Sequence, residues 1–312
     1  MKILIIGGTH FIGPAASRRL AQSGHEVTLF HRRFSPDVPY PQIQGDCRHT
    51  DDLYRALEAV NPDAILHMVA WSQGQIHALE RALQGRKIRA VILSSLDVYK
   101  AYEVFNRWSD APVVPLPLDE RSPLRDVLYP YRGRLDTDFA HDYEKILVER
   151  AALRSALLDV VILRLGMVYG RNDPNHRFLA PIRPMRRNAE RIELPEGMAR
   201  FRASKCHVED VAHGMKLAME SAVAKEIYNL AAQPTPTELE WHQRIAKLMN
   251  WRGEIVIVGR PAMPDEGNTA QHLIAETGKI RRELGYGELF SMDDGLVDTI
   301  HWELENEPEN VA

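Results

Sequence analysis

Three features are scarce in this sequence of 312 residues, and the first of them is cysteine. The only two cysteines, Cys47 and Cys206, lie far apart and have no metal-ligand spacing. We therefore expect reduced thiols in a cytoplasmic protein and no structural disulfide. The 13 histidines form no His-x-x-x-His pattern, so no metal site is expected either.

Long apolar runs and excess positive charge are also absent. No stretch approaches the roughly 20 apolar residues that a bilayer span requires, so no membrane association is expected. The opening run from Met1 to Ile6 stops at Gly7, which is typical of a buried strand and too short for a signal peptide. The formal net charge of -4 provides no overall basic field, which makes nucleic acid an unexpected partner.

What the sequence does contain, over its first 170 residues, is an alternation of short apolar runs and amphipathic segments. This pattern predicts an α/β fold of the Rossmann type, with a doubly wound parallel sheet. The predicted strands are residues 2–6, 26–30, 42–44, 64–70, 89–95 and 160–164, and the predicted helices are residues 11–23, 51–60, 73–84 and 136–156. A further strand is predicted at residues 226–230, after a helix that begins near Asp210.

This organisation divides the chain into two parts. Residues 1–170 are predicted to form a dinucleotide-binding Rossmann domain whose sheet is continued by residues 206–232. Residues 171–205 and 233–312 are predicted to form a smaller C-terminal substrate lobe. The segment from Asp97 to Leu135 is rich in proline and aromatic residues and has little periodicity, which is typical of a functional loop.

A glycine loop follows the first predicted strand and precedes a predicted helix, which is the context that a phosphate-binding turn needs. Gly7 permits the tight turn, Gly13 lets helix and strand pack closely, and the helix N-terminus offers N–H groups to a pyrophosphate. His10 stands where the middle glycine of the usual pattern would be. The predicted cofactor contacts in this loop are Gly7, Thr9, His10, Phe11, Ile12 and Gly13.

The end of the second strand bears on the choice between NAD and NADP. His31, Arg32 and Arg33 lie there, whereas an NAD-preferring site usually has an acid that binds the ribose hydroxyls. The two guanidinium groups could pair with a 2′-phosphate, which favours NADP slightly over NAD. An exposed pair of arginines at the surface is the alternative interpretation.

Several motifs occur in a fixed order along most of the chain. They are the glycine loop, Asp46, Leu66–Ala70, Ser94–Tyr99, Lys145–Glu149, Leu163–Gly170, His207–Ala212 and Lys279–Tyr286. With these motifs the chain resembles the extended short-chain dehydrogenase/reductases, which form the NAD-dependent epimerase/dehydratase family. The loop Gly-Gly-Thr-x-Phe-Ile-Gly is similar to that of an atypical branch, which includes chloroplast stem-loop-binding proteins.

The resemblance implies a catalytic set. Ser95 matches the family's serine, which hydrogen-bonds the substrate oxygen, and Lys145 matches the lysine that holds the nicotinamide ribose. The family's acid/base tyrosine falls on His141, which is the main departure. On a continuous helix His141 and Lys145 share one face, whereas Tyr143 is turned away by roughly 200°.

Two interpretations of His141 stay open. Histidine transfers protons near neutral pH and could replace the tyrosine. Equally, His141 could be a surface residue in a site that has lost its acid/base group. Tyr99, Tyr129 and Tyr131 are reserve candidates, since the long loop could fold over the nicotinamide and supply a phenol.

Further residues are assigned by position. The resemblance places Asp46 and Cys47 near the adenine, and Val69 and Ala70 along the cofactor. An arginine-rich stretch could face an anionic substrate group such as the diphosphate of a nucleotide sugar, and its members are Arg171, Arg177, Arg183, Arg186 and Arg187. By analogy with the family, a homodimer would form through residues 73–84 and 136–156.

Two functions follow from these observations. The first is an NAD(P)-dependent epimerase/dehydratase or reductase that acts on a carbon bearing a hydroxyl or carbonyl, with Ser95, His141 and Lys145 as catalytic residues. The alternative is a dinucleotide-binding regulatory or RNA-associated protein with weak or no redox chemistry. The missing tyrosine favours the alternative, and the negative net charge opposes its RNA form.

Overall fold

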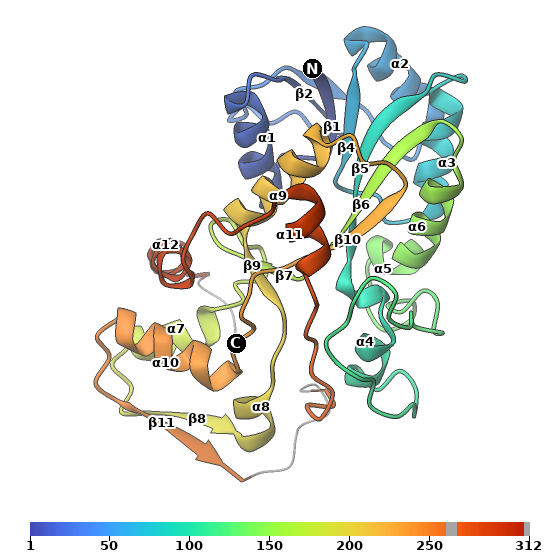
Figure 1. Cartoon of the computed structure of the whole chain (residues 1–312). Coiled ribbons are helices and arrows are strands. Elements are labelled where there is room, and N and C mark those ends of the chain that lie inside the picture. Colours follow the sequence, from blue (N-terminus) through green and yellow to red (C-terminus); the bar gives the residue numbers. More distant parts are fainter. Residues whose placement is uncertain (260–266, 309–312) are drawn as a thin grey trace.

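The computed structural model describes residues 1–259 and 267–308, and a parallel sheet lies at its centre (Figure 1). Seven strands follow the order β10-β6-β5-β4-β1-β2-β3, and every neighbouring pair is parallel. The strands are β1 (Lys2–Ile6), β2 (Glu26–His31), β3 (Gln42–Gln44), β4 (Ala64–His67), β5 (Ile88–Ser95), β6 (Leu158–Leu165) and β10 (Glu226–Leu230). The predicted Rossmann-type α/β fold is therefore confirmed.

Both faces of the sheet are covered by helices, which is why central strands such as β1 and β4 are mostly apolar. Alternate residues of β1 belong to two separate cores: Ile3 and Ile5 face one side, whereas Leu4 and Ile6 face the other. The first core is covered by α1 (Ile12–Gln22) and α9 (Val208–Glu220), and α11 (Gly278–Leu284) packs beside β10. The second core is covered by α2 (Thr50–Val60), α3 (Gln73–Ala82) and α6 (Lys145–Arg154).

Two sequence predictions are wrong in detail. The fourth strand ends at His67, so that residues 68–70 form a turn at the sheet edge. The long helix predicted at residues 136–156 is two helices, α5 (Asp138–Asp142) and α6, separated at Tyr143 and Glu144. The predicted loop after β5 also contains a short 3-10 turn at Leu96–Val98 and the helix α4 (Lys100–Phe105).

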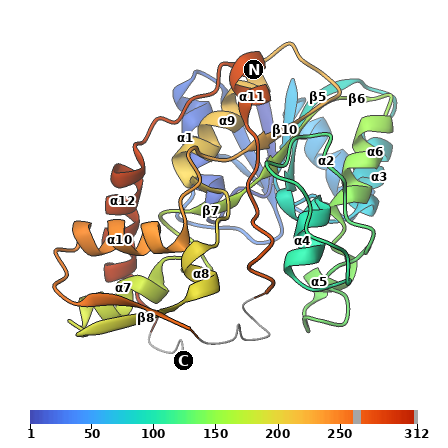
Figure 2. The same cartoon turned by 60° about the horizontal axis from the view of Figure 1, so that its bottom comes forward.

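The remaining residues build a region with its own apolar cluster. Its strands are β7 (Met167–Tyr169), β8 (Arg191–Pro195), β9 (Lys205–His207) and β11 (Glu254–Val258), which pair as β7 with β9 and β8 with β11. Its helices are α7 (Leu179–Arg186), α8 (Glu196–Arg200), α10 (Glu238–Leu248) and α12 (Met292–Glu305). Figure 2 shows α7, α10 and α12 gathered away from the sheet, and their buried side chains include Ile182, Trp241 and Leu296. The division of the chain near residue 170 stays a prediction.

Three general properties complete the description. Both cysteines are free, and both are buried. Within residues 1–259 and 267–308, no helix has the length and apolar character needed to cross a bilayer. The same residues hold no group of three or more His, Cys, Asp or Glu side chains that could bind a metal ion.

Candidate functional site

The glycine loop forms a tight turn between β1 and α1. Gly7 and Gly8 have φ values of +97° and +95°, which side chains rarely tolerate. A Cβ on Gly13 would lie 2.2 Å from the carbonyl carbon of Gly8, so only glycine lets α1 approach the loop this closely. The turn therefore brings the first turn of α1 against the end of β1, where a pyrophosphate would bind.

The side chains of the loop leave this approach open. His10 is exposed, and Thr9 is half-buried. The helix N-cap is Phe11, which makes no side-chain cap hydrogen bond, and the first turn of α1 carries no acid. The α1 N-terminus thus presents N–H groups and a partial positive charge without a negative side chain to compete for them.

At the end of β2, the structure places the two arginines at the surface. His31 is buried, whereas the side chains of Arg32 and Arg33 are exposed. The carbonyl of Arg32 accepts a hydrogen bond from Gln44 Nε2 at 3.0 Å, which ties this turn to β3. The arginines stand next to the glycine loop in the sheet order, because β1 and β2 are neighbours.

Asp46 and Cys47 follow β3, as the sequence places them. Arg48 donates to both Asp46 carboxylate oxygens, and this hydrogen bonding lowers the pKa of Asp46. Gln75 Nε2 lies 3.0 Å from Cys47 Sγ, and it also donates to the carbonyl of Val69 at 2.9 Å. Burial raises the pKa of the Cys47 thiol, so the thiol keeps its proton and has no nucleophilic role.

Lys145 is buried and connects three elements. It is the first residue of α6, and its Nζ donates to the carbonyls of Ala70 at 2.7 Å and Leu93 at 2.8 Å. The ammonium group therefore lies between the carboxyl ends of β4 and β5. Burial lowers the pKa of Lys145 to about 8, although Asp97 and Glu149 act to raise it.

The interruption between α5 and α6 changes which residue accompanies Lys145. Tyr143 has ψ 115° and Glu144 has φ -156° and ψ 89°, so neither is helical. The Tyr143 ring consequently turns inward, and its centroid lies 5.8 Å from Lys145 Nζ. The helical rotation that would turn Tyr143 away from Lys145 does not apply, because the chain is not helical at residues 143 and 144.

A buried carboxylate binds the Tyr143 hydroxyl. That hydroxyl donates to Asp97 Oδ2 at 2.7 Å, and the Tyr131 hydroxyl donates to the same oxygen at 3.1 Å. Burial raises the pKa of Asp97, while burial and the nearby Asp97 raise that of Tyr143 well above its usual value. Within the part of the chain that the structure describes, Asp97 Oδ1 is buried without a hydrogen-bond partner.

Ser95 lies at the edge of this group. It ends β5, and its Oγ accepts a hydrogen bond from the Asp97 amide at 3.1 Å. The Ser95 side chain also faces the Tyr143 hydroxyl and acts to lower its pKa. Ser95, Asp97, Tyr143 and Lys145 thus form one cluster, which we call the Tyr143 cluster.

His141 does not join the Tyr143 cluster. Its side chain is 69% exposed, and its Nδ1 lies 2.9 Å from Asp142 Oδ1 at the surface of α5. The expectation that His141 and Lys145 share one helix face is wrong, because the helix ends at Asp142. The structure therefore removes the geometric basis for His141 as the acid/base group.

The reserve tyrosines have different surroundings. Tyr99 is fully buried and donates to Asn229 Oδ1 at 2.7 Å, and burial raises its pKa to about 12. Tyr129 packs beneath the Arg132 guanidinium at 3.9 Å. Tyr131 alone reaches the Tyr143 cluster, where its ring centroid lies 5.2 Å from that of Tyr143.

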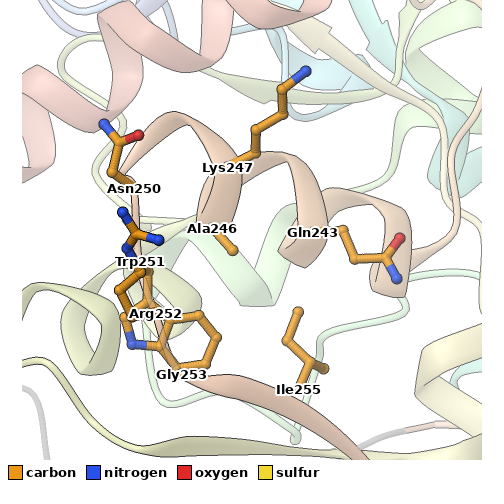
Figure 3. A pocket seen from close by; sticks show the side chains of 8 residues that line it. All are labelled: Gln243, Ala246, Lys247, Asn250, Trp251, Arg252, Gly253 and Ile255. Carbon is orange, nitrogen blue, oxygen red and sulfur yellow. The ribbon is translucent and has the colours of Figure 1, made fainter.

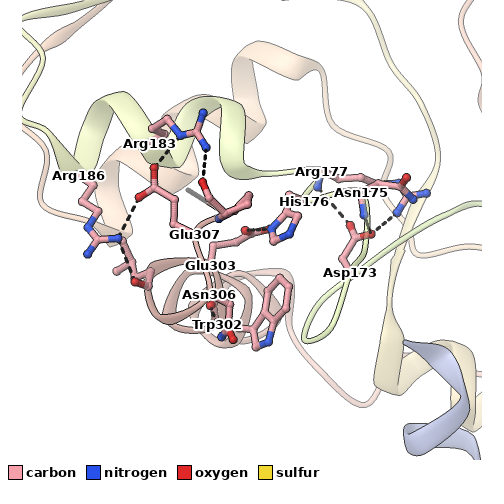
Figure 4. A network of polar contacts seen from close by, with 12 residues as sticks. Asp173, Asn175, His176, Arg177, Arg183, Arg186, Trp302, Glu303, Asn306 and Glu307 are labelled. Atoms are coloured by element: carbon pink, nitrogen blue, oxygen red, sulfur yellow. Dashed lines mark hydrogen bonds and ion pairs between the residues drawn. The ribbon is translucent and has the colours of Figure 1, made fainter. Parts of the chain in front are cut away.

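The arginine-rich stretch is already paired with carboxylates of the chain (Figure 4). Arg183, Arg186 and Arg187 converge on Glu307 at 2.7, 3.0 and 3.5 Å. Arg177 pairs with Asp173 at 2.6 Å, and Arg171 pairs with Asp298 at 2.8 Å. Three of these arginines share one carboxylate of the chain, Glu307, and their expected role at an anionic substrate group stays a prediction.

A shallow pocket of about 500 Å³ lies elsewhere, beside α10 and β11 (Figure 3). Its lining residues are Gln243, Ala246, Lys247, Asn250, Trp251, Arg252, Gly253 and Ile255. None of them belongs to the glycine loop or to the Tyr143 cluster. This pocket is therefore separate from the candidate functional site.

Ser95 and Lys145 are predicted from their sequence motifs, whereas helical periodicity excludes Tyr143 and no motif indicates a role for Asp97. The helix interruption is visible only in the structure, where the Glu144 side chain accepts a hydrogen bond from the Ile146 amide as the cap of α6. Glutamate is not among the residues that usually cap a helix N-terminus, so the sequence carries no local signal for this break. Apolar periodicity alone runs through this position and hides it.

Comparisons with known proteins place this geometry in a family. The sequence model of the NAD dependent epimerase/dehydratase family matches residues 3–231. The chloroplast stem-loop binding protein of 41 kDa b from Arabidopsis thaliana is 24% identical, over 96% of this chain and 78% of its own length. The dTDP-glucose 4,6-dehydratase of Streptomyces niveus is 25% identical, over 98% of this chain and 94% of its own.

A solved structure superposes on nearly the whole chain. The dTDP-glucose 4,6-dehydratase of Bacillus anthracis str. Ames, solved in complex with NAD, superposes with a TM-score of 0.71. It is 17% identical, and the alignment covers 98% of this chain and 97% of that chain. This likeness establishes the fold, and the sequence match over residues 3–231 establishes the family. The chain belongs to the NAD dependent epimerase/dehydratase family.

Proposed function

We propose that this protein is a nicotinamide-dinucleotide-dependent enzyme of the epimerase/dehydratase type. The observation that carries this proposal is the Tyr143 cluster, in which a serine, a tyrosine, a carboxylate and a lysine meet at the carboxyl ends of β4 and β5. In open α/β sheets, ligands bind outside the carboxyl ends of the strands. The glycine loop lies at the same edge, because β1 and β4 are neighbours.

The residues present fit a dinucleotide. Gly13 lets α1 pack closely against the glycine loop, the first turn of α1 has no acid that would repel a pyrophosphate, and Arg32 and Arg33 suit a 2′-phosphate. We therefore retain NADP as the slightly preferred cofactor, with NAD as the alternative that the Bacillus anthracis dehydratase binds. When bound, the nicotinamide supplies hydride transfer at a carbon bearing a hydroxyl or carbonyl.

Each side chain of the Tyr143 cluster has a distinct role in this proposal. Tyr143 holds its proton, because burial and Asp97 raise its pKa, so it acts as the acid toward a substrate oxygen. Ser95 steadies that oxygen through its hydroxyl. Lys145 orients the nicotinamide ribose, and Asp97 holds the Tyr143 hydroxyl in place through Oδ2. His141 has no role.

The proposed substrate is a nucleotide sugar. The curated relative from Streptomyces niveus is named for dTDP-glucose, and it aligns with nearly the whole chain. A sugar carbon that bears a carbonyl suits the protonated Tyr143, because hydride transfer to that carbon leaves an oxygen that takes the Tyr143 proton. Oxidation of a sugar hydroxyl would run this step in reverse, and it would need Tyr143 without its proton to accept the proton of the hydroxyl.

The test compares two variants that separate the candidates for the acid. We expect NADPH and NADH to bind in a fluorescence titration, with NADPH binding more tightly. Against a panel of nucleotide sugars, Tyr143→Phe should lower kcat on the order of 100-fold or more, since it removes the proton donor. His141→Ala should leave kcat within about twofold, as an exposed residue outside the site does.

Two outcomes would contradict this proposal. Equal activity in Tyr143→Phe and the unmodified protein would remove Tyr143 from the mechanism. Cofactor binding without turnover of any sugar would favour the alternative function, a dinucleotide-binding regulatory protein with weak or no redox chemistry.

A further inference from the structure

A buried ion pair lies immediately beside the Tyr143 cluster. Arg125 Nη1 and Nη2 donate to the two carboxylate oxygens of Glu144 at 2.7 and 2.8 Å. The two side chains are 0% and 1% exposed, so the pair is fully removed from water. Arg125 comes from the long loop after β5, and Glu144 comes from the junction between α5 and α6.

Glu144 also holds the backbone at this junction. Its Oε1 accepts from the Ile146 amide at 2.9 Å, and its Oε2 accepts from the Tyr129 amide at 2.6 Å. Its own amide donates to the carbonyl of Trp71 at 2.8 Å. Both carboxylate oxygens therefore serve two partners each, and Glu144 joins α6, the long loop and the turn after β4.

Arg125 reaches the other side of the Tyr143 cluster. Its Nε donates to the carbonyl of Asp97 at 3.0 Å, and its Nη1 donates to the carbonyl of Val127 at 2.6 Å. Its amide donates to the carbonyl of Val98 at 2.8 Å. The ion pair thus links the backbone of Asp97 to the residue between Tyr143 and Lys145.

Stability alone is a weak reason for such a pair. Desolvation of two charges offsets much of their attraction, and apolar residues of similar volume often serve equally well. An apolar pair could not form hydrogen bonds with the amides of Ile146 and Tyr129 or with the carbonyl of Asp97. Those bonds keep residues 143 and 144 out of the helical conformation, and a helix there would rotate Tyr143 away from Asp97.

We propose that Arg125 and Glu144 are positioning residues that hold Tyr143 and Lys145 in one site although only one residue separates them. This inference rests on the proposed function, because it assigns to the ion pair the geometry of the proposed acid. Neither residue touches the substrate. Their effect passes through the backbone at Tyr143 and through the Asp97 carbonyl.

The first test is kinetic and uses a matched pair of controls. Glu144→Gln and Arg125→Met should each lower kcat on the order of 100-fold, since a small misplacement of a catalytic group has that effect. The KM for the cofactor should change much less than kcat, because the glycine loop is not involved and only the contact of Lys145 with the ribose is disturbed. Arg125→Lys keeps the charge without the fork and should recover part of kcat.

The controls remove an exposed ion pair that joins the same two segments. Arg132 Nη2 lies 3.9 Å from Asp142 Oδ1, and these side chains are 45% and 71% exposed. Arg132→Met and Asp142→Asn should leave kcat within about twofold, as surface substitutions usually do. A loss of kcat in these controls equal to that in Glu144→Gln would overturn the assignment, because any disturbance of the loop would then suffice.

A second readout does not depend on turnover. Hydrogen–deuterium exchange should become faster at the Tyr129 and Ile146 amides in Glu144→Gln, while exchange in β1 and α1 is unchanged. Faster exchange with unchanged kcat would overturn the positioning role and leave a structural one. If the unmodified protein turns over no substrate, the proposed function fails. In that case, unchanged hydrogen–deuterium exchange at the Tyr129 and Ile146 amides in Glu144→Gln would overturn the positioning role as well.

Discussion

At the scale of single residues, the candidate site depends on groups whose burial changes their proton affinity. Lys145 is the clearest case. Its ammonium group is buried and donates to two backbone carbonyls, and burial lowers its pKa. Its pKa of about 8 is lower than the ordinary value of 10.5. Between these two pH values, the unfolded chain keeps a proton that the folded chain has released.

The pH dependence of Lys145 gives a prediction for activity. We expect kcat/KM to fall as pH rises through about 8, because the charged ammonium that holds the ribose is lost there. Lys145→Met should have low activity without this alkaline limb. Stability should respond in the opposite direction, since the contribution of Lys145 increases as pH rises from about 8 to 10.5. An alkaline limb that persists unchanged in Lys145→Met would assign it to another group.

Residue identity alone predicted half of this cluster. Ser95 and Lys145 occur in recognisable motifs, and the structure places both at β5: Ser95 ends this strand, and Lys145 Nζ donates to the carbonyl of Leu93. Tyr143 was excluded by a rotation that holds only within a helix. The pairing of Tyr143 with Asp97 bridges 46 positions of sequence, and no local pattern reports such a contact.

At the scale of elements, the strands were predictable and the segment before α6 was not. Buried parallel strands are continuous apolar runs, and glycine turns mark their ends, so the six strands predicted in the first 170 residues all exist. The prediction of one helix at residues 136–156 is wrong because the chain breaks between α5 and α6. Side chains of the distant loop, above all Arg125, bind Glu144 at this break. Tertiary contacts of this kind override local periodicity.

The long loop has a second anchor at α4, which gives a prediction for acid stability. Glu103 Oε2 accepts from the amides of Asp126 and Val127 at 2.8 and 3.1 Å, and Oε1 accepts from Lys100 and Ser109. Burial acts to raise the pKa of Glu103, but these hydrogen bonds outweigh it and lower the pKa to about 2. A lowered carboxylate pKa stabilises the fold above the ordinary pKa of 4.5, and this stability is lost as pH falls toward 2.

Glu103→Gln should therefore lower the free energy of unfolding at pH 7 by roughly 2 kcal/mol. The difference from the unmodified protein should shrink between pH 4.5 and pH 2, as urea unfolding at several pH values would measure. Asp126→Asn is the control, because Asp126 contacts the same Lys100 but its side chain is 87% exposed. A constant difference at all pH values would mean that packing, and not the charge of Glu103, is lost.

At the scale of the whole molecule, the order of seven parallel strands places the glycine loop and the Tyr143 cluster at one edge. The Rossmann part of the fold could be predicted because each βαβ unit is a local pattern with a fixed handedness. The C-terminal region is built from short elements with distant partners, such as β8 with β11, and only the structure defines it. The predicted homodimer through α3 and α6 stays a prediction.

The distribution of charge over the molecule bears on the alternative RNA-associated function. The net charge is -4, and the arginines of the region around α7 pair with carboxylates of the chain. A protein binds RNA largely through Lys and Arg side chains that neutralise the phosphates and release the counterions of the RNA. In the region around α7, carboxylates of the chain compete with phosphates for the arginines. The 24% identity to a chloroplast stem-loop binding protein does not by itself indicate that this chain binds RNA.

We therefore expect weak RNA binding at physiological salt, with dissociation constants no tighter than the ~10⁻⁴ to 10⁻⁶ M of non-specific association. Fluorescence anisotropy with a labelled stem-loop RNA, repeated at several salt concentrations, measures this directly. Glu307→Gln should tighten the binding of RNA only slightly, because it frees arginines on a chain that stays acidic overall. Nanomolar binding that weakens steeply with salt in the unmodified protein would instead show a basic surface strong enough to support an RNA-associated function.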